Sequence, residues 1–213
     1  MEVVALIQVD AGITGHAGEI GVFHGKLLIA LAHMVGPRPK VTAIDVFDDQ
    51  SKNVDGAGIG SLEKLKDNIT LHGPPDADYG FIKADSIAMT SSEKDQIMRD
   101  RGPFRLFSVD GCHTLEHTYN DLLTAQEFLS PGGVMILDDM MQPHWPPGVT
   151  EAVHQFYART VPRVKPFLYA YHKLFFVGYG WHAHFLERTR VATEGRTDVR
   201  IVQMFGSPIV SIF

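Results

Sequence analysis

The chain of 213 residues has a single cysteine, no run of basic residues and no long apolar stretch. One cysteine, Cys112, excludes an internal disulfide and a zinc cluster built on cysteines. A membrane-spanning helix needs roughly 20 consecutive apolar residues, so no membrane partner is expected. Residues 1–12 contain acids and no basic segment, unlike a signal peptide. These absences predict a cytoplasmic protein.

The balance of charge also argues against nucleic acid as a partner. The formal net charge is −6, whereas a surface that binds DNA or RNA is basic. Apolar residues make up 45% of the chain and charged residues 21%, which is typical of a globular protein. The length suits one well-buried core, so residues 1–213 are expected to form a single domain. The composition leaves homo-oligomerisation open.

Short apolar runs alternate with amphipathic stretches along the chain, a pattern typical of βαβ units. Helices are expected between the strands, and Ser61 and the Thr90–Glu93 pair have the spacing of N-caps. The sequence predicts a doubly wound α/β fold with a mostly parallel seven-stranded sheet. The last two strands are expected to form an antiparallel edge pair near the C-terminus, because no convincing crossover helix separates them. The predicted strands are Gly18–Phe23, Val41–Val46, Tyr79–Lys83, Phe104–Val109, Val134–Leu137, Lys173–Val177 and Arg200–Phe205.

A glycine-containing turn follows the first predicted strand. Residues 19–25 read Glu-Ile-Gly-Val-Phe-His-Gly, an acid followed by Gly21 and Gly25. Glycines allow the backbone to approach a ligand closely, and the next helix N-terminus favours an anionic group. Asp45 ends the second strand, where an acid can accept hydrogen bonds from ribose hydroxyls. A plain tight turn and a helix cap explain each signal alone, but together Glu19, the glycines and Asp45 favour a cofactor containing a nucleoside.

Asp85 and Ser86 follow the third predicted strand. An adenine ring is expected at this position when a nucleoside lies across the ends of such a sheet. The alternative is a solvated loop, and the residues alone do not decide between the two.

Acidic residues gather at the ends of the fourth and fifth predicted strands. Asp110 and His113 follow one strand, and Asp138 and Asp139 follow the next. Because parallel strands end at the same edge of the sheet, these carboxylates would repel one another unless a cation lay between them. Oxygen ligands suit Mg²⁺ or Mn²⁺, and a histidine beside them is a candidate general base. Helix caps and solvated loops are the alternative interpretation.

Three segments together resemble class I S-adenosylmethionine-dependent methyltransferases, and more narrowly their macrocin-type O-methyltransferase branch. These segments are residues 19–25, residues 109–113 (Val-Asp-Gly-Cys-His) and residues 129–139, which end in Asp138-Asp139. The resemblance covers Gly18 to Tyr157 and implies S-adenosylmethionine as cofactor. It also implies that Asp110, Asp138 and Asp139 hold Mg²⁺ and that His113 serves as the base. Asp110 is also expected beside the cofactor.

The resemblance implies methyl transfer from S-adenosylmethionine to a hydroxyl of a small molecule, of sugar or phenol type. One alternative is a nicotinamide-dependent oxidoreductase, although the Gly-x-Gly-x-x-Gly fingerprint is missing. Another is a binding module without catalytic activity, which has no need of three acids at one edge. His144 and Trp145 follow the acidic pair and are candidates for an aromatic wall of the acceptor site.

Overall fold

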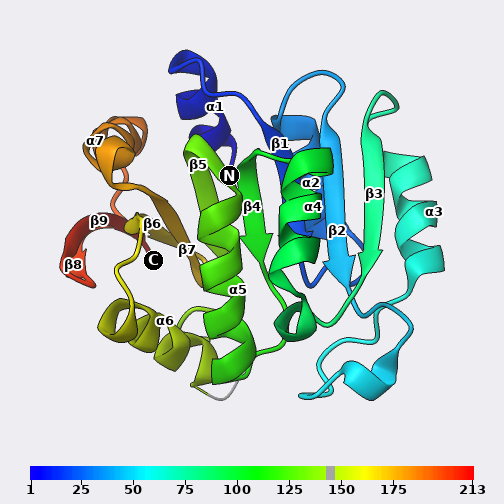
Figure 1. The fold of residues 1–213 in the computed structure, drawn as a ribbon. Helices are drawn as coiled ribbons and strands as arrows, with labels where there is room; N and C mark the ends of the chain where they lie inside the picture. The colour runs from blue at the N-terminus through cyan, green and yellow to red at the C-terminus, as the bar shows by residue number, and fades with distance from the viewer. Residues whose placement is uncertain (143–146) are drawn as a thin grey trace.

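The computed structural model describes residues 1–142 and 147–213. The candidate aromatic wall at His144 and Trp145 lies outside the described residues. Within them, one mixed sheet is sandwiched between helices on both faces (Figure 1). The strand order is β3-β2-β1-β4-β5-β7-β6-β9-β8. No helix in this part of the chain is long and apolar enough to cross a membrane.

Strands β1 to β5 run parallel to one another and form one half of the sheet. The central strand β4 is buried along its whole length, as expected where helices cover both faces of a parallel sheet. Strands β6 to β9 form the other half, in which all neighbouring pairs except β6–β9 are antiparallel. The strands are β1 (His16–Ile20), β2 (Lys40–Asp45), β3 (Asp78–Lys83), β4 (Phe104–Val109), β5 (Leu129–Leu137), β6 (Val164–Ala170), β7 (Lys173–Gly178), β8 (Val199–Met204) and β9 (Ser207–Ile212).

The helices form two layers, one on each face of the sheet. Buried side chains of α4, α5 and α6 pack on one face, and those of α1, α2, α3 and α7 pack on the other. Figure 1 shows α4 and α5 in front of the sheet and α2 behind it. The helices are α1 (Glu2–Asp10), α2 (Lys26–Met34), α3 (Leu62–His72), α4 (Ser91–Arg101), α5 (Leu115–Phe128), α6 (Gly148–Arg159) and α7 (His182–Ala192).

The predicted α/β class and mostly parallel sheet are confirmed, but the sheet has nine strands rather than seven. The two missed strands are β6 and β9. Each contains a proline near its start, Pro166 and Pro208, a residue that weakens a strand prediction. Helices α1 and α7 were also not predicted.

The predicted partnership between Lys173–Val177 and Arg200–Phe205 is wrong. Both segments are strands in antiparallel pairs, but β7 pairs with β5 and β6, while β8 pairs with β9 at the edge. Two-residue turns at Tyr171-His172 and Phe205-Gly206 create these hairpins, and all four residues have positive φ. Asn-Gly and Asp-Gly are the usual signals for such turns, so Tyr-His gives no warning of a hairpin.

The local signals at helix starts are confirmed. Ser61 caps α3 by accepting from the backbone N–H of Lys64. Thr90 and Glu93 form a capping box at α4, in which the Glu93 carboxylate accepts from the Thr90 backbone N–H at 2.8 Å. The first strand ends at Ile20, three residues before the predicted end, because the residues that follow form the turn into α2.

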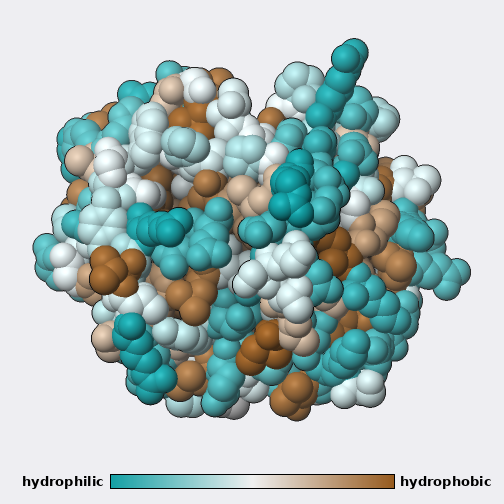
Figure 2. Space-filling view, in the orientation of Figure 1, coloured by the Kyte–Doolittle hydropathy of each residue, from teal (hydrophilic) through white to brown (hydrophobic). Residues whose placement is uncertain are grey.

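The parallel half directs the ends of β1, β2, β4 and β5 toward one edge of the sheet. In Figure 1 this edge lies at the bottom, between α6 and the loop 46–60. On the face shown in Figure 2, apolar residues are scattered singly or in small groups among polar ones, without one continuous apolar patch. Ligands of open α/β sheets bind at the carboxyl ends of the parallel strands, so a ligand site is expected at this edge.

Candidate active site

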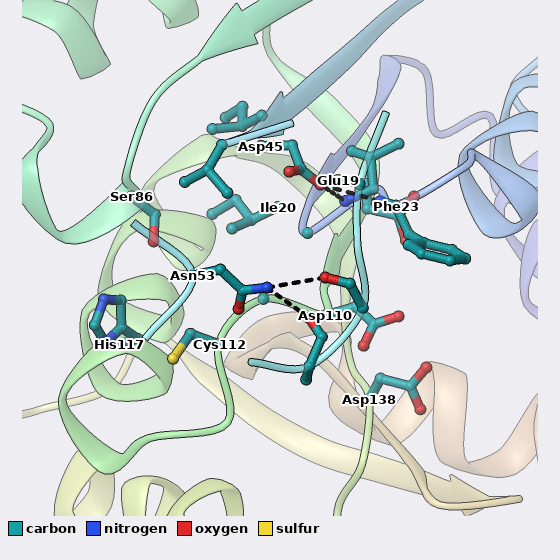
Figure 3. Close-up of a pocket in the computed structure, with 18 of the residues that line it drawn as sticks. Glu19, Ile20, Phe23, Asp45, Asn53, Ser86, Asp110, Cys112, His117 and Asp138 are labelled. Atoms are coloured by element: carbon teal, nitrogen blue, oxygen red, sulfur yellow. Dashed lines mark hydrogen bonds between the residues drawn. The ribbon is translucent and has the colours of Figure 1, made fainter. Parts of the chain in front are cut away.

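A cavity of about 590 Å³ opens at the carboxyl ends of the parallel strands. Its lining includes most of the residues singled out in the sequence, namely Glu19, Gly21, Asp45, Asp85, Ser86, Asp110, His113 and Asp138. Gly25 and Asp139 do not line it. In Figure 3, Asp110 and Asp138 lie on one side of the pocket, and Ser86 and His117 lie on the other.

Two positions in the turn after β1 leave no room for a side chain. Gly21 has φ +78, and a Cβ there would overlap the backbone of Asp110. The turn and the end of β4 are therefore in close contact, and both line the pocket. Gly25 has φ +86 at the N-cap of α2, where a Cβ would overlap the side chain of Leu65. Its missing side chain thus allows α2 to pack on α3.

Asp45 at the end of β2 holds the turn in shape. One carboxylate oxygen accepts from the backbone N–H groups of Val22 and Phe23, at 2.7 and 3.0 Å, and Figure 3 shows the Phe23 end of this contact. The other oxygen accepts from the backbone N–H of Phe47 at 2.6 Å. A carboxylate offers about four acceptor positions, so Asp45 keeps roughly one for a ligand.

Asp85 and Ser86 lie near two residues of α5 that the sequence analysis missed. The Nε2 atom of His117 is 3.5 Å from a carboxylate oxygen of Asp85. The Asn120 amide donates to the backbone carbonyl of Ser86 at 3.0 Å. His117 and Asn120 are three residues apart in the first turns of α5, a spacing that places both on one helix face and is the signal that points to them.

Glu19 and Asp110 are acids with little access to water. Glu19 is 1% exposed, and burial raises its pKa to about 8. Its Oε2 atom has no hydrogen-bond partner among the described residues. Burial also raises the pKa of Asp110 well above its usual value, and the negative charges of Asp138 and Glu19 raise it further. Both shifts favour the protonated acids, because ionising them together would bring several negative charges close to one another in a buried place.

His113 is held between two carboxylates. Its Nδ1 lies 2.7 Å from Asp55 and its Nε2 lies 2.7 Å from Asp139. Burial alone would lower the pKa of His113, but the hydrogen bonds and charges of Asp139 and Asp55 raise it, to about 9. His113 is therefore protonated at neutral pH while both carboxylates contact its ring.

The loop 46–60 supplies Asp55, which the sequence analysis missed. Its carboxylate also accepts from the backbone N–H groups of His113, at 2.7 Å, and Ala57, at 2.9 Å. The Asn53 amide donates to the Ala57 and Gly58 carbonyls and closes the loop on itself. Asp55 lies in a stretch of glycine and polar residues, which reads as a solvated loop, so nothing in the sequence marks it.

The four polar residues after β4 and β5 are not equivalent. Ligand atoms of Asp110, His113 and Asp139 all lie within 4.8 Å of one another, a grouping able to hold a metal ion. Asp139 has φ +56, a left-handed conformation that is rare outside glycine. Asp138, the third acid of the predicted magnesium set, instead forms an ion pair with Lys173 of β7. Lys173 was predicted only as part of a strand.

A family model described as a methyltransferase domain matches residues 19–140, more than half of the chain. The chain belongs to the methyltransferase domain family. The match includes the predicted cofactor-binding, metal-binding and catalytic residues, from Glu19 to Asp139. No curated protein sequence matches the methyltransferase, and the family match leaves a nicotinamide-dependent oxidoreductase without support.

Solved structures with the same fold include several O-methyltransferases. The O-methyltransferase NovP is 17% identical, with a TM-score of 0.61 over 83% of this chain and 77% of NovP. CalS11, a TDP-rhamnose 3'-O-methyltransferase, is 16% identical, with a TM-score of 0.56 over 83% of this chain and 77% of CalS11. MycE, solved with Mg and S-adenosylhomocysteine, is 16% identical, with a TM-score of 0.52 over 89% of this chain and 53% of MycE. The methyltransferase thus spans about half the length of MycE.

These likenesses confirm the class I methyltransferase fold that the sequence motifs implied. The neighbours named are O-methyltransferases, the branch that the motifs of residues 109–113 and 129–139 resemble.

Proposed function

We propose that this methyltransferase transfers the methyl group of S-adenosylmethionine to a hydroxyl oxygen of a small molecule. The observation that carries the proposal is a single pocket with two different sides. A glycine turn and Asp45 form a side suited to a nucleoside, and Asp110 and His113 form a side suited to an acceptor hydroxyl. The whole pocket edge of the parallel strands falls within the family match to residues 19–140.

The cofactor is assigned to the ends of β1 to β4. Glu19 and Gly21 lie by its methionine part, Asp45 by the ribose, and Asp85 and Ser86 by the adenine. The volume of about 590 Å³ supports this assignment, because small-molecule sites commonly measure roughly 300–1,000 Å³. The acceptor position of Asp45 that is not taken by backbone N–H groups is available to one ribose hydroxyl.

The donor set around Asp110 fits a divalent cation. The Asp110 carboxylate lies beside other acids, whose negative charges raise its pKa. Asp110 and Asp139 bring two carboxylates together beside His113, and carboxylate oxygens suit Mn²⁺ or Mg²⁺. MycE, which shares the fold, was solved with Mg. When bound, such a cation would supply Lewis acidity that lowers the pKa of an acceptor hydroxyl.

His113 is the residue placed to move the proton. Its Nδ1 stays on Asp55, and its Nε2 faces Asp139 and the acidic side of the pocket. The hydrogen bond and the negative charge of Asp139 raise the pKa of His113 and keep its ring protonated. A cation on Asp139 would lower the pKa of His113, and Nε2 is the ring nitrogen placed to accept the hydroxyl proton. The oxygen then attacks the methyl carbon in line, and S-adenosylhomocysteine leaves with the electron pair of the broken bond.

The acceptor is proposed to be a sugar or a phenol, because an acidic, cation-binding wall suits a hydroxyl that must lose its proton. CalS11 is named for a nucleotide-linked sugar, which makes nucleotide sugars the first acceptors to try.

The proposal is tested by incubating the protein with S-adenosylmethionine, Mn²⁺ and a panel of nucleotide sugars and catechols. Mass spectrometry should detect an acceptor heavier by one methylene group together with S-adenosylhomocysteine. His113→Ala serves as the control for background transfer. If neither S-adenosylmethionine nor S-adenosylhomocysteine shifts the thermal unfolding of the protein, the proposal is wrong.

A further inference from the structure

Lys173 is the single pocket-lining residue, among those described, that comes from the C-terminal half of the sheet. It is the first residue of β7, and its side chain is 25% exposed. Leu137 of β5 pairs with Leu174 of β7, and continuing this register places Lys173 opposite Asp138. The ammonium group of Lys173 is therefore built in beside the acidic pair.

The backbone fixes this position from a second direction. Lys173 follows the tight Tyr171-His172 turn. The backbone carbonyl of His172 accepts from the backbone N–H of Met140 at 2.8 Å, one residue beyond Asp139. The hairpin that carries the lysine is thus tied to the segment that carries the acids, and the ion pair is not a chance contact of a long surface side chain.

Both carboxylate oxygens of Asp138 have partners. One accepts from the backbone N–H of Asp139 at 2.8 Å, and the other pairs with Lys173. The group whose ligand atoms converge includes Asp110, His113 and Asp139 but not Asp138.

We propose that Lys173 is a positioning residue that keeps Asp138 away from a bound cation and sets the affinity of the site for that cation. The inference rests on the metal part of the proposed function and makes it more specific. The positive charge of Lys173 lowers the pKa of Glu19 and of Asp110, against the larger effect of burial. A divalent cation has to bind against this fixed positive charge and is held by Asp110 and Asp139, with His113 beside them as the base.

The first test is the affinity for Mn²⁺ alone, measured by electron paramagnetic resonance of the free ion without cofactor or acceptor. Lys173→Met removes the charge and keeps the length of the side chain, so Mn²⁺ should bind at least about tenfold more tightly, as expected from removing a unit charge several ångströms away. Lys173→Arg keeps the charge and should stay within about twofold of the parent protein. Lys173→Gln provides a second neutral variant if the methionine variant does not fold.

Lys165→Met is the matched control. Lys165 lies near the start of β6, paired with Val177 at the far end of β7, and its ammonium group faces the ring of Tyr179. Its loss should leave Mn²⁺ affinity unchanged, since the charge is remote from the acids.

A double variant separates the two roles that Asp138 can have. In Lys173→Met with Asp138→Asn, a neutral pair replaces an ion pair, so Mn²⁺ should bind within about threefold of the parent protein. Asp110→Asn should lose most of the binding. A double variant as weak as Asp110→Asn would make Asp138 a ligand and overturn the inference. Unchanged Mn²⁺ affinity in Lys173→Met would overturn it too.

The failure of this inference can be told from the failure of the proposed function. S-adenosylhomocysteine binding is measured by calorimetry on the same variants, and Lys173→Met should keep it. If the variant loses that binding, Lys173 belongs to the cofactor site and the inference is overturned. If neither the parent protein nor Lys173→Met binds Mn²⁺ but both bind S-adenosylhomocysteine, the inference and the metal part fall while the cofactor part stands.

Discussion

The two halves of the sheet differ in how they are built and in what they contribute. Strands β1 to β5 are parallel, and β1 to β4 alternate with helices, so their carboxyl ends meet at one edge. Strands β6 to β9 are joined as two hairpins with two-residue turns and pack large apolar side chains such as Phe167 and Phe176. The parallel half supplies nearly all of the pocket, and the C-terminal half supplies Lys173. The position of a residue at the carboxyl end of a parallel strand therefore decides whether it lines the pocket, and the burial of its strand does not.

The largest expected effect concerns His113, in the parallel half. His113→Ala should lower the turnover number by about 10²- to 10⁴-fold, which is the usual contribution of a general base. Its affinity for S-adenosylhomocysteine should stay unchanged, because His113 faces the acidic side of the pocket. Rates and calorimetry on the same sample measure both. His184→Ala, an exposed histidine of α7 in the C-terminal half, is the matched control; equal rates for the two variants would remove His113 from the chemistry.

The next effect tests whether the C-terminal half is part of the same domain. Phe167 is fully buried, with its ring centroid 5.1 Å from that of Phe185. Phe167→Ala should lower the free energy of unfolding by about 3–5 kcal/mol. Urea denaturation should show one cooperative transition for both halves, as a single domain requires.

Ile201→Ala is the control for that experiment. Ile201 lies on the edge strand β8 and is 52% exposed, so its truncation should change the free energy of unfolding by less than about 0.5 kcal/mol. Two separate transitions in either protein would show that the halves fold independently.

The pH dependence of stability gives a third prediction, again in the parallel half. The pKa of Glu19 is about 8 in the folded protein and 4.5 when unperturbed. Between these values the folded state holds a proton that the unfolded state has released, so this group destabilises the fold increasingly as pH rises from about 4.5 to 8. Each pH unit costs at most about 1.4 kcal/mol.

Glu19→Gln should remove this slope, because glutamine stays neutral and keeps nearly the same shape. Urea titrations of both proteins with a chelator present, at several pH values, provide the comparison. Curves that run parallel for the two proteins would mean that Glu19 is ionised in the folded state.

The smallest expected effect concerns Asp45 and the cofactor. Asp45→Ala should weaken S-adenosylhomocysteine binding about 10- to 100-fold, since a hydrogen bond to a charged acceptor contributes roughly 1.5–3 kcal/mol. Some stability should be lost as well, because the backbone N–H groups of Val22, Phe23 and Phe47 lose their acceptor. Asp48→Ala, an exposed acid in the same loop, is the calorimetric control. Equal affinities in the two variants would place the ribose elsewhere.

Sequence patterns were sufficient where local chemistry decides the structure. Strand β4 was predicted from end to end because it is continuously buried, and Ser61 and Thr90 marked helix starts by capping. The polar residues at the ends of parallel strands, such as Asp45 and Asp110, were also found, because each lies at the end of a predicted strand. The direction of the strand places them at the pocket whatever surrounds them.

Sequence patterns failed where distant segments decide the structure. Asp55 reaches His113 only because the loop 46–60 folds back over the strand ends. Lys173 reaches Asp138 only because β7 runs antiparallel beside β5. Neither contact can be recognised from a short spacing in the sequence, because the residues involved lie far apart along the chain. The Tyr171-His172 turn also lacks the glycine or asparagine that usually marks a hairpin. These two contacts were therefore the least predictable features of the candidate site.

A crystal structure of the protein with S-adenosylhomocysteine and Mn²⁺ tests the account most directly, because anomalous scattering identifies the manganese. The account predicts S-adenosylhomocysteine across the ends of β1 to β4, with Asp45 at its ribose. It also predicts manganese held by Asp110 and Asp139, with Lys173 still paired with Asp138. Manganese bound to Asp138 in place of Lys173, or S-adenosylhomocysteine outside this pocket, would contradict it.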